Sequence, residues 1–300
     1  MAEWCWHCHK SMRISTLQVD GREQPAVLVP GRGFAVFGVI DPSLPDSLLA
    51  ALDQGLPNGL AGAAASLPDE RLVPFAGAVY RPLYRRPRKI LGIGLNYRAH
   101  AADLSASVPS EPASFLKGEH TVIGYGDAID LPAQSKRVTA EAELGVIFGR
   151  ECRGVDESEA LDCIAGVCLS LDQTAEDILQ LNPRFLTLAK NFPGFFSFGP
   201  QLITTDEVSA LFPSLSDIRI STVRNHKTEA SATIADMVFS IPYLISFHSK
   251  VMPFYPGDIM STGTPGATVI SDGDTVECAI DGLGVLRNSV RGARDADSGA

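Results

Sequence analysis

The sequence has few charged residues and no long apolar run, and both features exclude classes of protein. No apolar stretch approaches the roughly 18–20 residues that a membrane-spanning helix needs, and no apolar signal segment follows the N-terminus. Only 20% of the 300 residues are charged, and the formal net charge is −10. The only dense basic stretch, 81–89, is bounded by prolines and is typical of a linker. We therefore expect a soluble, cytoplasmic protein whose partner is neither a membrane nor a nucleic acid.

Cysteine is also scarce, and its spacing lacks the framework of a disulfide-stapled secreted domain. The six cysteines stand at positions 5, 8, 152, 163, 168 and 278. The first two belong to Cys5-Trp-His-Cys-His9, which matches the C-x-x-C-H pattern of covalent haem attachment. That attachment normally requires export, and neither zinc partners nor a βαβ context lies nearby. We therefore expect residues 1–11 to form a loose N-terminal extension.

What the chain does contain is typical of a turn-rich, β-rich α+β protein. Its 27 glycines, 20 prolines and 45% hydrophobic content allow a large core broken by many turns. Short apolar runs at 14–19, 26–29 and 34–40 predict strands, and residues 45–52 predict a short helix. These elements define a small N-terminal α+β domain over residues 12–85.

A second, larger domain is predicted over residues 88–291. The expected strands are 89–94, 141–149, 165–171, 201–205, 217–224, 274–280 and 284–290, and the expected helices are 96–103, 156–163, 174–181 and one from Ser240. Because strands outnumber helices and connections are short, we expect a mixed-β core in place of a doubly wound sheet. The small polar residues 292–300 predict a flexible tail.

Two glutamates on one predicted strand are the strongest candidates for chemistry. Side chains alternate along a strand, so Glu141 and Glu143 share a face. A solvated strand edge is the simplest reading of such a pair taken alone. The alternative is a hard cation, Mg²⁺ or Mn²⁺, with Asp172 from a following apolar run as third oxygen ligand.

Other polar residues have both a structural and a functional interpretation. Gly92-Ile-Gly94 follows a strand, but Tyr97 replaces the third glycine of a dinucleotide fingerprint, which favours a tight turn. His100 and Asp103 are three residues apart on a predicted helix, as an ordinary surface pair or as a general base with its orienting acid.

A lysine and a turn also have two interpretations. Lys190, in an apolar setting, is either a snorkelling lysine or a partner for a substrate carboxylate or enolate. The turn around Thr264 is either a simple turn or a loop whose N–H groups and hydroxyl bind an oxyanion. Neither residue decides between its interpretations alone.

Taken together, the motifs resemble the fumarylacetoacetate hydrolase family, in the family's order along the chain. The matching stretches are 94–103, 112–117, 126–132, 141–144, 189–192, 198–200, 233–240, 256–259, 262–265 and 282–288. The resemblance implies a mixed β-sandwich roll around Mg²⁺ or Mn²⁺, held by two glutamates and an aspartate. Those roles fall on Glu141, Glu143 and Asp172.

The resemblance also implies catalytic and substrate-binding roles. A histidine and an acid activate water, and His100 with Asp103 stands in that place, although the family usually has glutamate for the acid. Lys190 matches the family's active-site lysine. Tyr97, Lys117 and Thr264 match substrate-contacting positions, with Thr264 the family's threonine. Family members are commonly homodimers.

The sequence departs from the family pattern in the expected substrate pocket. Glu176 stands where many members have an arginine, which reverses the local charge. Pro193 replaces an aspartate, and Thr139-Ala140 replaces a usual Asp-Tyr.

We expect a metal-dependent hydrolase that cleaves a C–C bond in a β-dicarbonyl or 2-oxo acid through an enolate. Decarboxylation, as in a lyase, or isomerisation would use the same enolate without water attack. Because part of the pocket differs, a non-catalytic binding relative that kept the fold is the alternative of another class.

Overall fold

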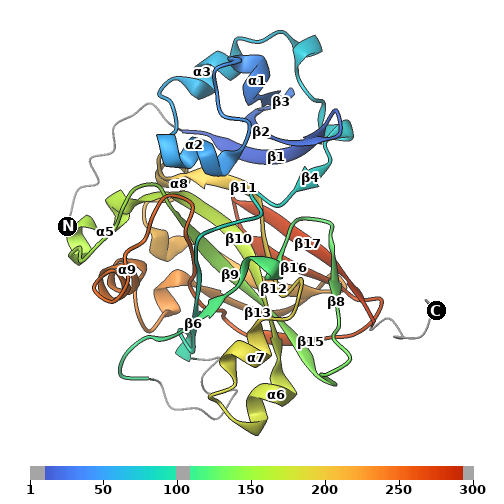
Figure 1. Ribbon diagram of the computed structural model, residues 1–300, viewed down its shortest axis with the longest axis vertical. Helices are drawn as coiled ribbons and strands as arrows, with labels where there is room; N and C mark the ends of the chain where they lie inside the picture. The colour runs from blue at the N-terminus through green and yellow to red at the C-terminus, as the bar shows by residue number, and fades with distance from the viewer. Residues whose placement is uncertain (1–10, 99–108, 293–300) are drawn as a thin grey trace.

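Two β-sheets form the body of the molecule in the computed structural model, which describes residues 11–98 and 109–292 (Figure 1). The larger sheet contains β1 (Arg13–Val19), β2 (Arg22–Val29), β3 (Gly33–Val36), β4 (Tyr80–Arg81), β5 (Ile90–Gly94), β6 (Ala113–Lys117), β7 (Val122–Ile123), β9 (Val138–Phe148), β10 (Ile164–Ala175), β11 (Phe196–Thr204), β14 (Ile259–Ser261) and β15 (Ala267–Ile270). The smaller sheet contains β8 (Ala128–Asp130), β12 (Arg219–Arg224), β13 (Lys227–Thr233), β16 (Thr275–Ile280) and β17 (Gly284–Arg291).

The helices are short and lie around these sheets. They are α1 (Phe37–Ile40), α2 (Leu48–Gln54), α3 (Leu60–Ala65), α5 (Glu157–Ala160), α6 (Glu176–Leu181), α7 (Leu186–Lys190), α8 (Thr205–Leu211) and α9 (Ile241–Ser249). The 3-10 turns are η1 (Asp69–Arg71), η2 (Phe75–Gly77), η3 (Glu119–Thr121), η4 (Leu161–Cys163), η5 (Leu215–Asp217) and η6 (Ile234–Asp236). The mixed, β-rich α+β architecture expected from the sequence is confirmed.

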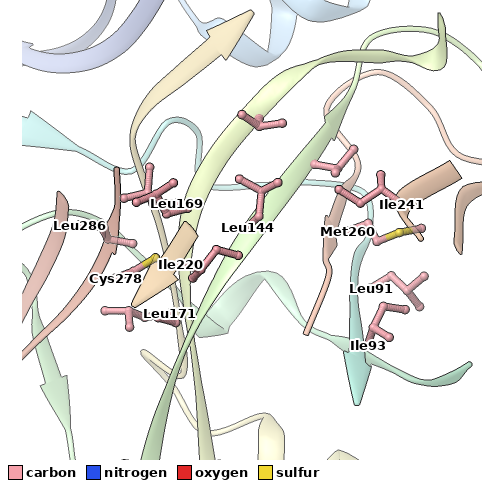
Figure 2. Packing of buried hydrophobic residues seen from close by; sticks show 14 of the residues in the cluster. Leu91, Ile93, Leu144, Leu169, Leu171, Ile220, Ile241, Met260, Cys278 and Leu286 are labelled. Atoms are coloured by element: carbon pink, nitrogen blue, oxygen red, sulfur yellow. The ribbon is translucent and has the colours of Figure 1, made fainter. Parts of the chain in front are cut away.

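The two longest strands, β9 and β10, form the antiparallel centre of the larger sheet, in the order β3-β2-β1-β11-β10-β9-β14-β5-β6. One face of this pair, including Leu144 and Leu169, packs with Ile220 and Leu286 of the smaller sheet in an apolar core. Figure 2 shows these side chains between the strands. Alternation places the next residues on the opposite face, so the glutamates of β9 point away from this core.

The other face of β9 and β10 is divided along its length. At one end, Ile147 and Cys168 pack in a second apolar cluster with side chains of the N-terminal segment, including Phe37 and Leu52. At the other end the same face carries Glu141, Glu143 and Asp172. The apolar packing therefore stops where the carboxylates begin.

The N-terminal strands belong to the larger sheet, because β1 pairs antiparallel with β11. In Figure 1, α1, α2 and α3 lie with these strands at one end of the molecule, and α6 and α7 lie at the other. That residues 12–85 form a domain of their own stays a prediction.

Two local expectations were wrong. Residues Phe37–Ile40 form α1 and not the end of a strand, because a short apolar run fits either element. Thr174 and Ala175 continue β10, so α6 begins only at Glu176. Both residues pair with β9, Thr174 with Thr139 and Ala175 with Val138, and this pairing extends the strand.

Within the described residues, no helix combines the length and apolarity that crossing a membrane would require.

Candidate metal centre

Three carboxylates meet on one face of the central strand pair. Asp172 of β10 lies opposite Glu141 of β9 in the antiparallel register, and Ser170 lies opposite Glu143. One oxygen from each carboxylate lies within 4.8 Å of the others. Glu143 and Asp172 are only 2% and 1% exposed, so both charges are removed from water. Glu141 and Glu143 share one face of β9, as strand alternation predicts, and the pairing of β10 with β9 places Asp172 beside them.

Two buried lysines balance this negative charge. Lys190 Nζ donates to Glu141 Oε2 at 3.0 Å and to Asp172 Oδ2 at 2.5 Å. Lys117 Nζ donates to the other oxygen of Asp172, Oδ1, at 2.5 Å. The Phe115 ring lies beneath both ammonium groups, with its centroid 4.7 Å from Lys190 Nζ and 5.9 Å from Lys117 Nζ. Asp172 is thus held between two cations.

The pKa values of the two lysines differ in direction. Burial disfavours the charged form of Lys190, but Asp172 and Glu141 outweigh burial and raise its pKa. Burial dominates at Lys117 and lowers its pKa, although Asp172 opposes the shift. Lys190 is therefore the more firmly charged of the two.

Glu143 is fixed from the side of the 261–266 segment. Ser261 Oγ donates to Glu143 Oε2 at 2.5 Å, and the N–H of Gly263 donates to the same oxygen at 3.0 Å. Burial, followed by the charges of Asp172 and Glu141, raises the pKa of Glu143 to about 8. A cation beside this carboxylate would offset both causes.

The donor set fits a hard divalent cation. All three candidate ligands are carboxylates, the type that Mg²⁺ and Mn²⁺ prefer over sulfur or imidazole donors. Their mutual repulsion and their burial are the penalties that a divalent cation removes. Glu141, Glu143 and Asp172 would hold such an ion, with Ser261 and Gly263 orienting Glu143 behind them.

The remaining predicted site residues have different positions. Tyr97 is 1% exposed, and burial, followed by the charge of Glu143, raises its pKa. Its hydroxyl has no hydrogen-bond partner within the described residues. The Thr264 hydroxyl is engaged with the backbone of Gly266, donating to its carbonyl at 3.0 Å. Substrate contacts by Tyr97, Lys117 and Thr264 stay predictions.

His100 and Asp103 lie outside the described residues. Their predicted role in activating water therefore stays a prediction.

The structure adds residues that were not expected at the site. Thr174 donates to Glu141 at 2.8 Å, and Ser261 and Phe115 take the places described above. Thr174 stands two residues after Asp172, so strand alternation could have found it had the strand been predicted to continue. The sequence around Ser261 does not predict this contact, because Ser261 reaches Glu143 only through the pairing of β14 with β9.

The charge reversal at Glu176 is compensated by a neighbour in space. Arg137, directly before β9, pairs with Glu176 at 2.6 Å, and Gln180 donates to the other oxygen at 3.0 Å. A guanidinium is therefore present beside this position, although it comes from the segment before β9. Pro193 is exposed in the turn after α7.

Comparison with known proteins identifies the family of this chain. A family model described as fumarylacetoacetate (FAA) hydrolase C-terminal matches residues 89–291. Oxaloacetate tautomerase Fahd2a of Rattus norvegicus, a mitochondrial protein, is 31% identical over 300 residues, covering 95% of this chain and 93% of the relative. The chain therefore belongs to the fumarylacetoacetate hydrolase family.

Solved structures support the same fold. The 2-hydroxyhepta-2,4-diene-1,7-dioate isomerase of Mycobacterium marinum has a TM-score of 0.76 at 26% identity, covering 95% of this chain and 100% of that one. Maleylpyruvate hydrolase of Sphingobium sp. SYK-6, in complex with manganese(II) and pyruvate, has a TM-score of 0.76 at 26% identity, covering 94% and 100%. These relatives are enzymes of several reaction types that share one fold.

Proposed function

We propose that this protein is a divalent-metal-dependent hydrolase that cleaves a C–C bond in a β-dicarbonyl or 2-oxo acid. The observation that carries the proposal is the buried group of three carboxylates with two ammonium groups. Its supporting comparison is maleylpyruvate hydrolase, which was solved with manganese and pyruvate. A bound Mg²⁺ or Mn²⁺ would supply a Lewis acid for the oxygen atoms of the oxo acid.

The chain's own residues supply charge and orientation. Lys190 keeps its proton beside the carboxylates, so it offers a fixed positive charge to the negative oxygen that develops when the C–C bond breaks. Lys117 supplies a second ammonium group, and the Phe115 ring packs against both ammonium groups. His100, oriented by Asp103, would take a proton from the attacking water, as the family resemblance implies.

Tautomerisation of a 2-oxo acid is the second candidate reaction. It is favoured by the similarity to oxaloacetate tautomerase over nearly the whole chain. The same enolate would then be reprotonated, and no water attack would be needed. Decarboxylation would also use this enolate.

Product analysis distinguishes these reactions. Purified protein with Mn²⁺ would be incubated with acylpyruvates and with enol-oxaloacetate, and products followed by NMR and by enol absorbance. Hydrolysis releases pyruvate and a second acid, tautomerisation changes the enol signal without loss of carbon, and decarboxylation releases CO₂. We expect Glu141→Ala to abolish the reaction and Glu277→Ala, at a buried glutamate outside the site, to retain it.

His100→Ala tests the water-activating role. Under the hydrolase proposal it lowers the rate of C–C cleavage by about 10²–10⁴-fold. Cleavage at the wild-type rate would show that the role assigned to His100 is wrong. No turnover of any oxo acid by the wild type would favour the non-catalytic binding relative.

A further inference from the structure

The two ammonium groups of the site come from segments that are far apart in the sequence. Lys117 is the last residue of β6, and Lys190 is the last residue of α7. Both reach Asp172, one at each carboxylate oxygen, at 2.5 Å. Such a symmetric arrangement requires β6 and α7 to keep a fixed spacing.

Asn191, the residue after Lys190, provides a direct connection between these segments. Its side-chain Oδ1 accepts a hydrogen bond from the N–H of Gly118 at 2.8 Å. Its Nδ2 donates to the carbonyl of Leu116 at 3.1 Å. These two backbone groups flank Lys117 on either side. The Asn191 carboxamide therefore holds the backbone on both sides of Lys117. Asn191 itself directly follows Lys190 in the chain.

A third bond completes the connection. The Nε2 atom of His120 lies 2.8 Å from the backbone oxygen of Asn191. A Cβ at position 118 would lie 2.6 Å from the His120 ring, so a side chain there would displace this ring. The turn after β6 is thus folded against the end of α7.

We propose that Asn191 is a positioning residue that fixes Lys117 and Lys190 relative to each other, an inference that rests on the proposed function. Only an amide of this length offers a donor and an acceptor to the two backbone groups at once. Alanine loses both bonds, and aspartate lacks the donor for Leu116. Displacements of about 1 Å in an active site can cost about 10²-fold in rate, so the spacing matters for turnover.

Asn182 supplies a matched control. It lies in the connection between α6 and α7, and its Oδ1 accepts a backbone hydrogen bond from Arg184 at 3.0 Å. It therefore makes a local side-chain hydrogen bond in the same region, and among the described residues it hydrogen-bonds neither to β6 nor to either lysine. Asn182→Ala therefore measures the effect of losing a local asparagine side-chain hydrogen bond that does not involve β6 or the lysines.

The first experiment measures the lysines directly and does not depend on activity. Wild type, Asn191→Ala and Asn182→Ala are trace-labelled with acetic anhydride, with and without saturating Mn²⁺, and each lysine is quantified by mass spectrometry. In the structure the Lys117 and Lys190 side chains are 0% and 6% exposed. We expect Asn191→Ala to increase labelling at both positions several-fold relative to Asn182→Ala. Unchanged labelling would overturn the proposal.

The second experiment links position to reaction. We expect Asn191→Ala to lower kcat/KM for the active oxo acid by about 10–100-fold, while the Kd for Mn²⁺ stays within about twofold, because Asn191 contacts none of the carboxylates. In a Lys117→Met background the same change should cost much less, since one of the two lysines it positions is already gone. Full additivity in that background would overturn the positioning role and leave only a general effect on folding.

The outcomes also separate this proposal from the proposed function. If the wild type turns over no oxo acid, the proposed function fails, and labelling alone decides whether Asn191 fixes the lysines. If labelling rises but an active enzyme keeps its kcat/KM, the role of this spacing in the reaction is overturned.

Discussion

At the scale of single residues, the site is a balance between buried charges of opposite sign. Asp172 receives one ammonium at each oxygen, and Lys190 also bridges to Glu141. Breaking a buried pair by removing one partner is costly, because the remaining charge stays out of water. The energetic role of each lysine can therefore be measured separately from its role in catalysis.

Replacing Lys190 by methionine should destabilise the metal-free protein by about 3–5 kcal/mol. It should also lower kcat/KM by at least about 10²-fold, because the fixed positive charge is lost. Urea denaturation with and without Mn²⁺ provides the measurement. Since a divalent ion would supply the missing charge, Mn²⁺ should stabilise the variant more than the wild type. Equal stabilisation of Lys190→Met and the wild type by Mn²⁺ would contradict the proposed balance of charges.

Ser261 should affect the metal affinity without contacting the metal. Its hydroxyl orients Glu143, and removal of such outer contacts typically costs about 10–100-fold in affinity. We expect that loss for Ser261→Ala in calorimetric titration with Mn²⁺. Ser221→Ala, which removes a hydroxyl pair with Ser231 on the smaller sheet, should bind Mn²⁺ like the wild type. A wild-type affinity in Ser261→Ala would show that this hydroxyl does not hold the ligand.

At the scale of elements, the site depends on a turn that must approach β5 closely. Gly263 has φ +98°, and a Cβ there would lie 2.8 Å from the Cβ of Asn96. Asn96 in turn donates from Nδ2 to the Thr262 carbonyl at 2.8 Å. The backbone conformation and the close packing together explain why glycine stands at this position. In this conformation the Gly263 N–H donates to Glu143.

Gly263→Ala should therefore cost more than an ordinary glycine replacement. We expect a loss of about 2–5 kcal/mol, from the left-handed conformation together with the overpacking. Gly273→Ala is the matched control, because φ is +83° but nothing lies within 4 Å of the added Cβ. That variant should lose only about 1–2 kcal/mol. Similar losses in chemical denaturation would contradict the packing argument.

The elements also show which parts of the site the sequence could predict. Strand alternation put Glu141 and Glu143 on one face, and Asp172 was considered as their third ligand from the sequence alone. The family resemblance then favoured the metal over a solvated strand edge. The pairing of Lys117 with Asp172 could not be predicted, because it depends on where β6 lies relative to β10 in space. The same holds for Ser261, which is brought to Glu143 by strand order alone. The alternation of residues in the sequence predicts which side chains share a face of a strand. The tertiary arrangement of the strands decides which faces come together.

At the scale of the whole molecule, the stability should depend on pH through His248 as well as through the site. His248, on α9, is 2% exposed, and its Nδ1 lies 2.8 Å from the Leu244 carbonyl. Burial lowers its pKa below the ordinary 6.5, although the bond to Leu244 opposes the shift. The folded state therefore favours the neutral His248 ring, and protonation of this ring in acid favours the unfolded state.

The sign of the effect follows from linkage. The contribution of a neutral His248 is fully present above pH 6.5 and is lost as the pH falls below that value toward the lowered pKa. Between pH 7.5 and 5.5, we expect the wild type to lose more free energy of unfolding than His248→Gln, which cannot titrate. Urea denaturation at both values provides the test. Parallel losses in the two proteins would contradict it.

The central claim for the molecule is that one buried carboxylate group, built where the apolar packing of β9 and β10 stops, binds a divalent cation. The most direct measurement is calorimetric titration with Mn²⁺ and Mg²⁺ of the wild type, of Glu141→Ala/Glu143→Ala and of Glu277→Ala. We predict one bound ion per chain in the wild type and in Glu277→Ala, and none in the double variant. Absence of binding in the wild type, or binding that survives in the double variant, would contradict it.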